Sequence, residues 1–464
     1  MASKSKRARM APKENLQRKF LLWAIAVFFI KLAIIFRIEG MNAGSGDRVY
    51  FVDGAWLGAD GENYLVGYNA LLKDGIFSTE SLLNYWPAGY PLVLLFLSIL
   101  GKSWALTTLS ITQSAIFSYA AYFFATQISK TRLKKFAFLA FLLIILNPTL
   151  SLSSIAVGYE SFTASGILIV VGLIIKDFIE KNDKMFLRYL IISSIVVGLL
   201  SFTQPRLIVA GILLNVLWII TRKGVKASSL AVVITLVVTL LFPASLIYRN
   251  NQAIGINSIS TNLGVTMNIG AGDNATGGYM KEGYGVECDL SGTSTQQDNQ
   301  RTRCVLNWYL NNPTKAIKLF YNKSIYFWSP WINNGFAGDV FTGTMSRNPW
   351  LKISPLTNIA KKQEGANLIF GQIGRTLFWL WLLGGLTMLF YGYLILWRQN
   401  SLERFIGNLA MIAITTNWLI TLFTIGDHRF RIPIMGMSLF LQAIGLRTLF
   451  KGGKAPMVEG PALR

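Results

Sequence analysis

The stretch FLLWAIAVFFIKLAIIFRI, from Phe20 to Ile38, decides the class of this fold. It is long and apolar enough to cross a hydrocarbon core of about 30 Å as a helix. A basic segment, Met1 to Lys19, precedes it, and the apolar stretch is longer than that of a cleaved signal peptide. Basic flanks stay on the cytoplasmic side of a membrane. The pattern predicts a retained signal anchor that runs outward from a cytoplasmic N-terminus.

The rest of the chain repeats this apolar pattern. Hydrophobic residues make up 52% of the 464 residues, which is high for a soluble protein of this length. We expect an all-α polytopic membrane protein with about ten spans and both termini in the cytoplasm. The spans after the first are expected at residues 104–128, 136–152, 161–175, 189–203, 207–220, 228–247, 377–397, 405–425 and 433–450. Asn147-Pro148 is expected to bend the span at residues 136–152 near the outer face.

The domain organisation follows from these spans. The expected parts are a basic cytoplasmic tail (1–19), a transmembrane module of seven spans (20–247) with a first outer loop (39–103), a large extracytoplasmic segment (248–372), C-terminal transmembrane helices (373–450) and a cytoplasmic tail (451–464).

The formal net charge of +22 does not indicate nucleic acid binding. The excess of lysine and arginine lies mostly in segments assigned to the cytoplasm, which is the bias that orients membrane spans. Anionic lipid is the usual partner of such charge.

The first outer loop contains an apolar run, Leu92 to Leu100, that is too short to cross a bilayer. Crossing there would also place the basic cluster at Lys130–Lys135 outside. We expect a non-spanning helix at the membrane interface. A second interfacial helix is predicted from Val305 to Trp331, where aromatic residues alternate with lysines.

Asp60 is the main candidate for chemistry in this loop. It precedes a helical stretch from Glu62 to Lys73, so it is expected near a helix N-terminus. Backbone N–H groups there keep a carboxylate ionised. An ionised carboxylate outside the membrane is able to accept a proton from a well-placed acceptor hydroxyl.

Other ionisable residues fall at predicted outer boundaries, where such groups are functional candidates. Glu160 lies in one outer turn, and Asp427 and His428 lie in another. Several cations also lie there, against the usual charge bias, and phosphate is their expected partner, with pairing to outer carboxylates as the alternative. They are Arg206, Arg249, Lys323, Arg429 and Arg431.

Cys288 and Cys304 are the only cysteines, and both lie in the large extracytoplasmic segment. A disulfide is expected in that oxidising environment, with two free thiols as the alternative. A single histidine and the lack of a His/Cys cluster argue against zinc. Oxygen ligands from the first outer loop leave Mg²⁺, Mn²⁺ or Ca²⁺ as an open alternative to a metal-free site, and no other cofactor is expected.

Four motifs occur in a fixed order along the chain. They are Asp60-Gly61-Glu62-Asn63-Tyr64, Trp86-Pro87-Ala88-Gly89-Tyr90-Pro91, Arg249-Asn250 and Arg429-Phe430-Arg431-Ile432-Pro433. This set resembles the bacterial GT-C membrane glycosyltransferases, and among them glycosyltransferase family 39, which includes protein mannosyltransferases and the lipid A aminoarabinose transferase. The resemblance covers nearly the whole chain.

The resemblance implies a seven-span module with two juxtamembrane helices, at residues 62–74 and 90–100. The family's catalytic aspartate corresponds to Asp60, its outer-face acid to Glu160, and its arginine turn to Arg429–Arg431. Tyr64 closes the first motif as a candidate substrate-binding residue. Two departures matter. Gly61 separates Asp60 from Glu62, which leaves both as candidates for the base, and Gln204-Pro205-Arg206 replaces a usual Arg-Pro, which leaves the role of Arg206 open.

The function implied is transfer of a hexosyl or pentosyl group from a polyprenyl-phosphate donor to an acceptor hydroxyl. The reaction would take place on the extracytoplasmic face of a bacterial cell membrane. The expected partners are the lipid-linked donor, membrane lipids and an acceptor glycan, lipid or protein. His428 and the outer cations are candidate substrate-binding residues.

Two alternatives stay open. A transporter or flippase of a lipid-linked solute would show charges at the midplane and repeated broken helices. A glycan polymerase or ligase of another membrane fold would place its key residues in later outer loops.

Overall fold

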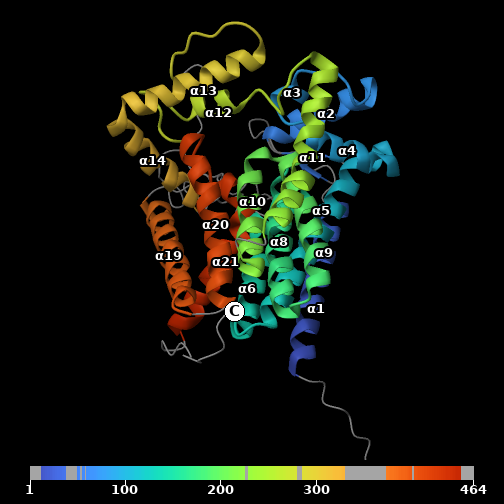
Figure 1. Cartoon of the computed structure of the whole chain (residues 1–464), viewed down its shortest axis with the longest axis vertical. Helices are drawn as coiled ribbons and strands as arrows, with labels where there is room; N and C mark the ends of the chain where they lie inside the picture. Colours follow the sequence, from blue (N-terminus) through green and yellow to red (C-terminus); the bar gives the residue numbers. More distant parts are fainter. Residues whose placement is uncertain are drawn as a thin grey trace, which may run out of the picture.

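The computed structural model describes residues 12–37, 50–52, 55–57, 59–224, 228–278, 285–329, 372–399 and 402–450. Long helices stand side by side and form the body of the molecule (Figure 1). They are α1 (Pro12–Arg37), α5 (Ala105–Ser129), α6 (Lys134–Ile145), α7 (Pro148–Leu152), α8 (Glu160–Glu180), α9 (Asp183–Thr203), α10 (Ile208–Lys223), α11 (Ser229–Ile254), α19 (Gln372–Trp397), α20 (Leu402–Phe423) and α21 (Ile432–Phe450). The predicted all-α architecture is therefore confirmed.

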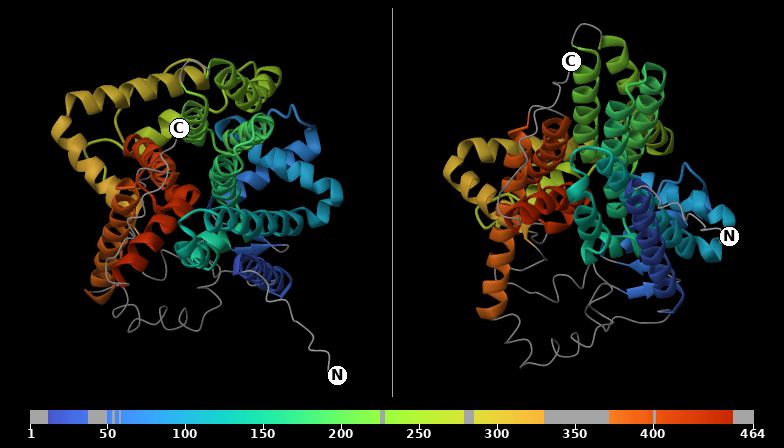
Figure 2. Two further views of the ribbon diagram at one scale, coloured as in Figure 1. Left: turned by 60° about the horizontal axis from the view of Figure 1, so that its bottom comes forward. Right: turned by 90° about the horizontal axis from the view of Figure 1, so that it is seen from below.

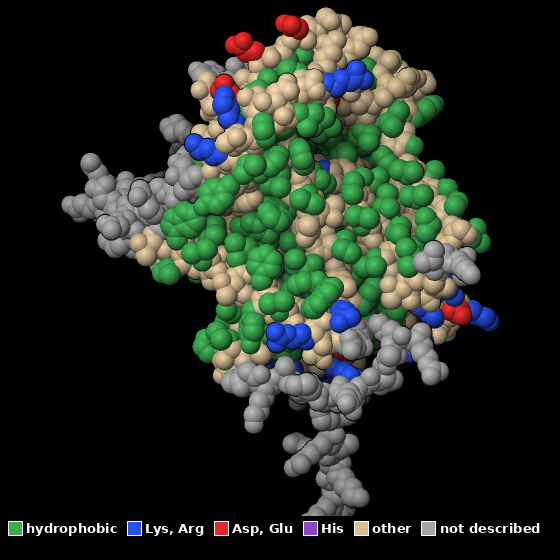
Figure 3. Space-filling model, turned by 60° about the vertical axis from the view of Figure 1, so that its left-hand side comes forward, with side chains coloured by type: hydrophobic (Ala, Val, Ile, Leu, Met, Phe, Trp, Pro, Cys, Tyr) green, Lys and Arg blue, Asp and Glu red, His purple; other side chains and the backbone are tan. Residues whose placement is uncertain are grey.

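The chain is a multi-pass membrane protein. Eight of the described helices are long and apolar enough to cross a membrane, and a ninth span results if the bent pair α6 and α7 counts as one. An apolar band crosses the middle of the face in Figure 3, with charged side chains above and below it. Helix α5 has the length of a span, but Ser, Thr and Gln residues interrupt its apolar sequence. The span predicted at residues 104–128 therefore stays a prediction.

The bend between α6 and α7 occurs where the sequence places Asn147-Pro148. The two helical segments meet at 56°. The Asn147 side chain accepts a hydrogen bond from the backbone N–H of Leu150 at 2.9 Å and so caps α7, and proline follows at its first position. The predicted bend in this span is confirmed.

Shorter helices gather at one end of the bundle, opposite the start of α1 and the end of α21 (Figure 1). We call them the outer layer, after the side to which the sequence assigns them. They are α2 (Ala59–Asp74), α3 (Leu82–Tyr85), α4 (Gly89–Leu97), α12 (Leu263–Ile269), α13 (Ser294–Asn311) and α14 (Pro313–Trp328). The apolar helix Gly89–Leu100, made of α4 and the 3₁₀ turn η1 (Ser98–Leu100), falls short of a span, as predicted.

The single interfacial helix predicted from Val305 to Trp331 is wrong. The chain forms two helices, because α13 ends at Asn311 and α14 starts at Pro313. Proline suits the first turn of a helix and cannot continue the preceding one. Figure 2 shows the two helices arching toward α20, against which α14 packs. Trp331 lies outside the described residues.

The sequence did not predict a small three-stranded sheet. It consists of β1 (Tyr50–Val52), β2 (Ala55–Leu57) and β3 (Ala156–Val157). Strands β1 and β2 are antiparallel, whereas β2 and β3 are parallel. The sheet joins the first outer loop to the segment that leads into α8.

The C-terminal helices close the bundle on one side. Helix α21 packs against α6 and α8, and α20 packs against α10. The 3₁₀ turns η4 (Pro205–Leu207) and η6 (His428–Arg431) lie at the outer-layer ends of α10 and α21. Both turns therefore come close to the start of α8.

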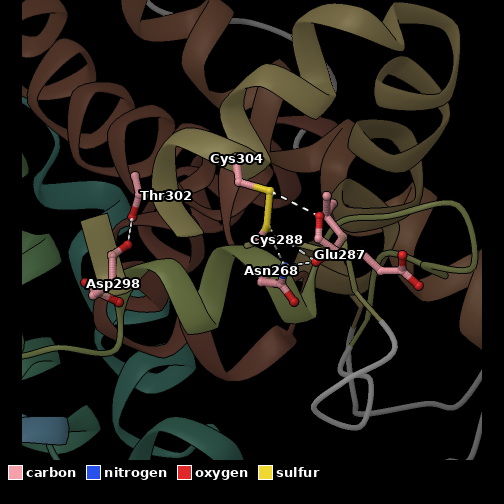
Figure 4. The surroundings of a disulfide bond; sticks show 7 residues. Asn268, Glu287, Cys288, Asp298, Thr302 and Cys304 are labelled. Atoms are coloured by element: carbon pink, nitrogen blue, oxygen red, sulfur yellow. Dashed lines mark hydrogen bonds between the residues drawn. A yellow bond between two sulfur atoms is a disulfide. The ribbon is translucent and has the colours of Figure 1, made fainter. Parts of the chain in front are cut away.

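The predicted disulfide between Cys288 and Cys304 is present, with a Cα–Cα distance of 6.0 Å (Figure 4). It links α13 to the loop that follows α12. The Asn268 side chain in α12 donates to the Val286 carbonyl at 2.7 Å, on the same loop. The disulfide and this hydrogen bond together hold α12, α13 and the loop between them in place.

Replacing both cysteines by serine should destabilise the outer layer. The bond closes a loop with a sequence separation of 16, and chain entropy gives about 3 kcal/mol for a loop of this size. Hydrogen exchange should show faster exchange across α12 and α13, with α5 and α8 unchanged as internal controls. Equal protection of α13 in both proteins would contradict this prediction.

Candidate active site

The parallel pairing of β2 and β3 brings two predicted acidic positions to one place. Leu57 pairs with Val157, and Asp60 and Glu160 each lie three residues beyond this pair. The two strands run in the same direction, and a helix follows each of them, α2 after β2 and α8 after β3. Asp60 is the second residue of α2, as expected for an N-terminal position, and its side chain lies outside the described part of the structure.

Glu160 begins α8 and forms a buried ion pair with Arg429. The Glu160 Oε1 accepts a hydrogen bond from Arg429 Nε, and the two residues are 5% and 7% exposed. The Asp427 carboxylate caps η6 by accepting the backbone N–H of Arg429 at 2.8 Å. The pair connects the transmembrane module with the C-terminal helices. It also brings together two residues that the sequence proposed separately.

Gly158 makes room for this carboxylate. A Cβ atom at this position would collide with Glu160 Oε2. Gly158→Ala should therefore push Glu160 away from Arg429 and destabilise the protein by about 1–3 kcal/mol, the usual cost of overpacking. Gly384→Ala in α19 is the control, because nothing lies within 4 Å of a Cβ there. Thermal unfolding followed by tryptophan fluorescence measures both, and equal midpoints would contradict the assignment.

Tyr90 connects this turn with the first outer loop. Its hydroxyl accepts the Gly158 N–H at 2.8 Å, and its ring centroid lies 4.8 Å from that of Tyr64 in α2. Both tyrosines are buried. Burial raises the pKa of Tyr90, so the hydroxyl stays protonated. Tyr90 thus connects Tyr64 with the turn before Glu160. Tyr90 belongs to the second sequence motif, but the sequence did not predict this contact.

Arg206, whose role the sequence left open, joins the same cluster. Its guanidinium lies 3.9 Å from the centroid of the Phe430 ring and 5.9 Å from that of Tyr159. Arg429 lies 5.3 Å from the same Tyr159 ring. The Arg206 Nε has no hydrogen-bond partner among the described residues. Two guanidinium groups therefore lie near the ring of Tyr159, the residue before Glu160.

The other predicted cations contact protein groups instead. Arg249 Nε donates to the Ile76 carbonyl at 2.9 Å and so ties α11 to the first outer loop. Lys323 is fully buried and donates to Tyr309 Oη at 2.7 Å and to the Leu422 carbonyl at 2.9 Å. Burial lowers the pKa of Lys323 to about 7.

Arg431 and His428 flank Arg429 in η6. Arg431 Nη1 donates to the Trp328 carbonyl at 2.8 Å, and His428 Nδ1 lies 3.1 Å from the Asp427 carboxylate. Arg431 thus fastens η6 to α14. Of the predicted phosphate-binding cations, Arg429 pairs with Glu160, and Arg206 lies near the same Tyr159 ring as Arg429.

The remaining acid candidate is Glu62. It lies in the first turns of α2, partly exposed, two residues after Asp60. No group of three or more His, Cys, Asp or Glu side chains suited to a metal ion occurs among the described residues. The Asp60 side chain and residues 38–49 are outside that set, so the open alternative of Mg²⁺, Mn²⁺ or Ca²⁺ stays a prediction.

No protein-family model matches the chain, and no curated protein matches its sequence. Several solved structures of an archaeal oligosaccharyltransferase from Archaeoglobus fulgidus do match. AglB in complex with an inhibitory peptide and a dolichol-phosphate is 14% identical, with a TM-score of 0.42 over 95% of this chain and 52% of that chain. The apo form is 15% identical, with a TM-score of 0.47 over 92% and 51%. The complex with Zn and sulfate is 14% identical, with a TM-score of 0.48 over 92% and 49%. This chain thus spans about half the length of the solved structures that it matches.

Proposed function

We propose that the protein is a GT-C glycosyltransferase of a bacterial cell membrane. It would transfer a hexosyl or pentosyl group from a polyprenyl phosphate to an acceptor hydroxyl on the extracytoplasmic face. One observation carries this proposal. The β2–β3 register brings the backbone at Asp60 to the Glu160 turn, where Arg429 and Arg206 supply positive charge. A base and anion-stabilising cations are the two requirements of this reaction.

In the proposed step the acceptor oxygen attacks the anomeric carbon of the donor sugar. The bond between that carbon and the phosphate oxygen breaks, and the electron pair leaves with the lipid phosphate. Asp60 takes the acceptor proton, with Glu62 as the alternative base. A single displacement of this kind inverts the anomeric configuration.

Arg206 and Arg429 would stabilise the charge that grows on the departing phosphate. A guanidinium binds phosphate oxygens through a planar fork. Arg429 is held by Glu160, so its direction is fixed before the donor arrives. Arg206 lies over the Phe430 ring and donates from Nη2 to the Tyr159 hydroxyl at 3.5 Å, while its Nε has no partner among the described residues and could bind a phosphate oxygen. Cations oriented in advance lower the barrier because they need no reorganisation.

Arg206→Gln should raise the KM for the donor and lower kcat, with a combined loss in kcat/KM of about 100-fold, typical of a lost charge-assisted contact in a site. The matched control is Arg188→Gln, an exposed arginine near the start of α9. Steady-state transfer rates at varied donor concentration give both constants. Unchanged donor KM and kcat in Arg206→Gln would remove this residue from the site.

The test of the function is transfer of radiolabelled sugar from a panel of synthetic polyprenyl-phosphate sugars by the purified protein. Extracted envelope glycans, lipids and proteins serve as acceptors, and parallel reactions contain EDTA, Mg²⁺, Mn²⁺ or Ca²⁺. We expect turnover of at least one donor. Translocation of a donor across liposomes without turnover would favour the transporter alternative instead.

A further inference from the structure

Helix α5 carries a polar stripe inside the bundle. Ser110, Gln113 and Ser114 are fully buried and lie on one face, because their spacing of three and four residues matches the helical period. The Ser110 hydroxyl donates to the Ile155 carbonyl at 3.3 Å. The Gln113 amide donates to the Ala156 carbonyl at 2.9 Å. The stripe therefore binds the backbone between α7 and α8, and it accounts for the polar sequence of a helix that otherwise has the length of a span.

Lys31 is a buried cation that faces this stripe. It lies in the first span, is 1% exposed, and donates from Nζ to Ser154 Oγ at 3.0 Å. The Ser154 hydroxyl is also 3.1 Å from Ser114 Oγ. The ammonium group lies 4.5 Å from the centroid of the Phe117 ring. Among the described residues no carboxylate pairs with it.

A lysine buried among helices of a membrane protein is costly and marks a functional region. Membrane insertion alone does not explain Lys31, since a leucine or methionine would insert more readily. The observed contacts supply a different reason, because each of them leads to the backbone that carries the candidate site.

The network continues from Ser154 to that site. Gln113 also contacts Tyr90, whose hydroxyl lies 3.5 Å from the Gln113 Oε1. Tyr90 in turn accepts the Gly158 N–H at 2.8 Å. Strand β3, which pairs with β2, lies between these two anchors. The stripe and Lys31 thus fix both ends of the segment that aligns Asp60 with Glu160.

We propose that Lys31 is a positioning residue of the active site. Its ammonium group holds Ser154, and through the α5 stripe it sets the β2–β3 register and the position of Glu160. The catalytic part of this inference rests on the proposed function, whereas the register itself is independent of any reaction. The bond between Lys31 and Ser154 is buried, so no water competes with it for either group.

The register is tested by disulfide trapping. Leu57→Cys and Val157→Cys change two residues that are Cα partners in the β2–β3 register, in a chain whose native cysteines are replaced by serine. Copper-catalysed oxidation in native membranes should trap this pair in high yield. Adding Lys31→Met, a near-isostere without charge, should lower the trapping rate about 10-fold. Lys176→Met is the control, because Lys176 in α8 pairs with Glu180 instead.

The catalytic consequence is measured in the chain with its native cysteines. We expect Lys31→Met to lower kcat about 100-fold, since a misplacement of about 1 Å costs that much, with the donor KM within about twofold of the wild type. Ser154→Ala, which removes one hydroxyl and keeps the fold, should give a smaller loss in the same direction. Because the two residues touch, their effects should not add.

The possible results separate the two proposals. Trapping and kcat that both equal the Lys176→Met control would overturn the role of Lys31. If Lys31→Met reduces trapping but the protein transfers no sugar, Lys31 sets the β2–β3 register and the proposed glycosyltransferase function is refuted. If Lys31→Met fails to accumulate, Ser154→Ala decides: an unchanged trapping rate in that variant overturns the proposal.

Discussion

Asp60→Asn should lower kcat about 1,000-fold while leaving folding and donor binding intact. Asparagine keeps the shape of the side chain and removes the proton acceptor, and general-base catalysis contributes about 10²–10⁴-fold to such reactions. Asp60 is the second residue of α2, so its backbone lies in the first turn, at the positive end of the helix dipole. Transfer of labelled sugar under single-turnover conditions measures this loss directly.

Two matched variants make the assignment specific. Asp74→Asn changes an exposed carboxylate at the other end of α2 and should leave the rate unchanged. Glu62→Gln tests the competing base, and we expect a loss below about 10-fold if Asp60 holds that role. Full activity in Asp60→Asn together with a large loss in Glu62→Gln would transfer the assignment to Glu62.

Glu160→Gln should destabilise the protein by about 3–5 kcal/mol, because it leaves Arg429 buried without its counter-charge. Arg429→Gln should cost a similar amount. The double variant should be more stable than the sum of the two losses predicts, since no charge is then left unpaired. Unfolding by heat or denaturant, followed by tryptophan fluorescence, gives the four values of the cycle.

The ion pair between Lys315 and Asp273 is the control for this cycle. Its partners are 2.9 Å apart, as close as in a buried pair, but their side chains are 54% and 62% exposed. Exposed pairs contribute little to stability because water screens their charges. Comparable losses of stability in the two cycles would show that burial does not make the Glu160–Arg429 pair more important for stability than an exposed pair.

The sequence predicted the helical framework well because hydropathy is a local property. The spans, the short helix at Gly89–Leu100 and the bend at Asn147-Pro148 each followed from length or from proline chemistry. The failure at Val305–Trp331 has a local cause too. Its aromatic and lysine pattern continues across Pro313, and that pattern outweighed a helix break at Asn312 that the proline itself indicates.

The site itself could be predicted only in part. Asp60, Glu160 and Arg429 became candidates through their places at outer boundaries and in motifs. Their alignment depends on strands of two and three residues, which are too short to show an alternating pattern. The role of Arg206 was left open because its partner ring, Phe430, is far away in the sequence. Tyr90 and Lys31 act through hydrogen bonds to residues far away in the sequence, and no single-sequence signal reports these.

The contacts of Arg249, Lys323 and Arg431 show why a count of outer cations overstates a phosphate site. Each of these side chains donates to a backbone carbonyl of another segment. Such bonds hold the outer layer on the bundle. Their value as binding residues stays a prediction, and Arg206 with Arg429 is the pair that the geometry favours.

The measurement that tests the central claim most directly is the anomeric configuration of the product. Purified protein would act on a polyprenyl-phosphate sugar of defined anomer, and nuclear magnetic resonance of the first product would identify the new linkage. An aspartate base at Asp60 and a direct attack by the acceptor predict inversion, with formation of this product lost in Asp60→Asn. A product that retains the donor configuration, or an inverted one formed equally well by Asp60→Asn, would contradict the account.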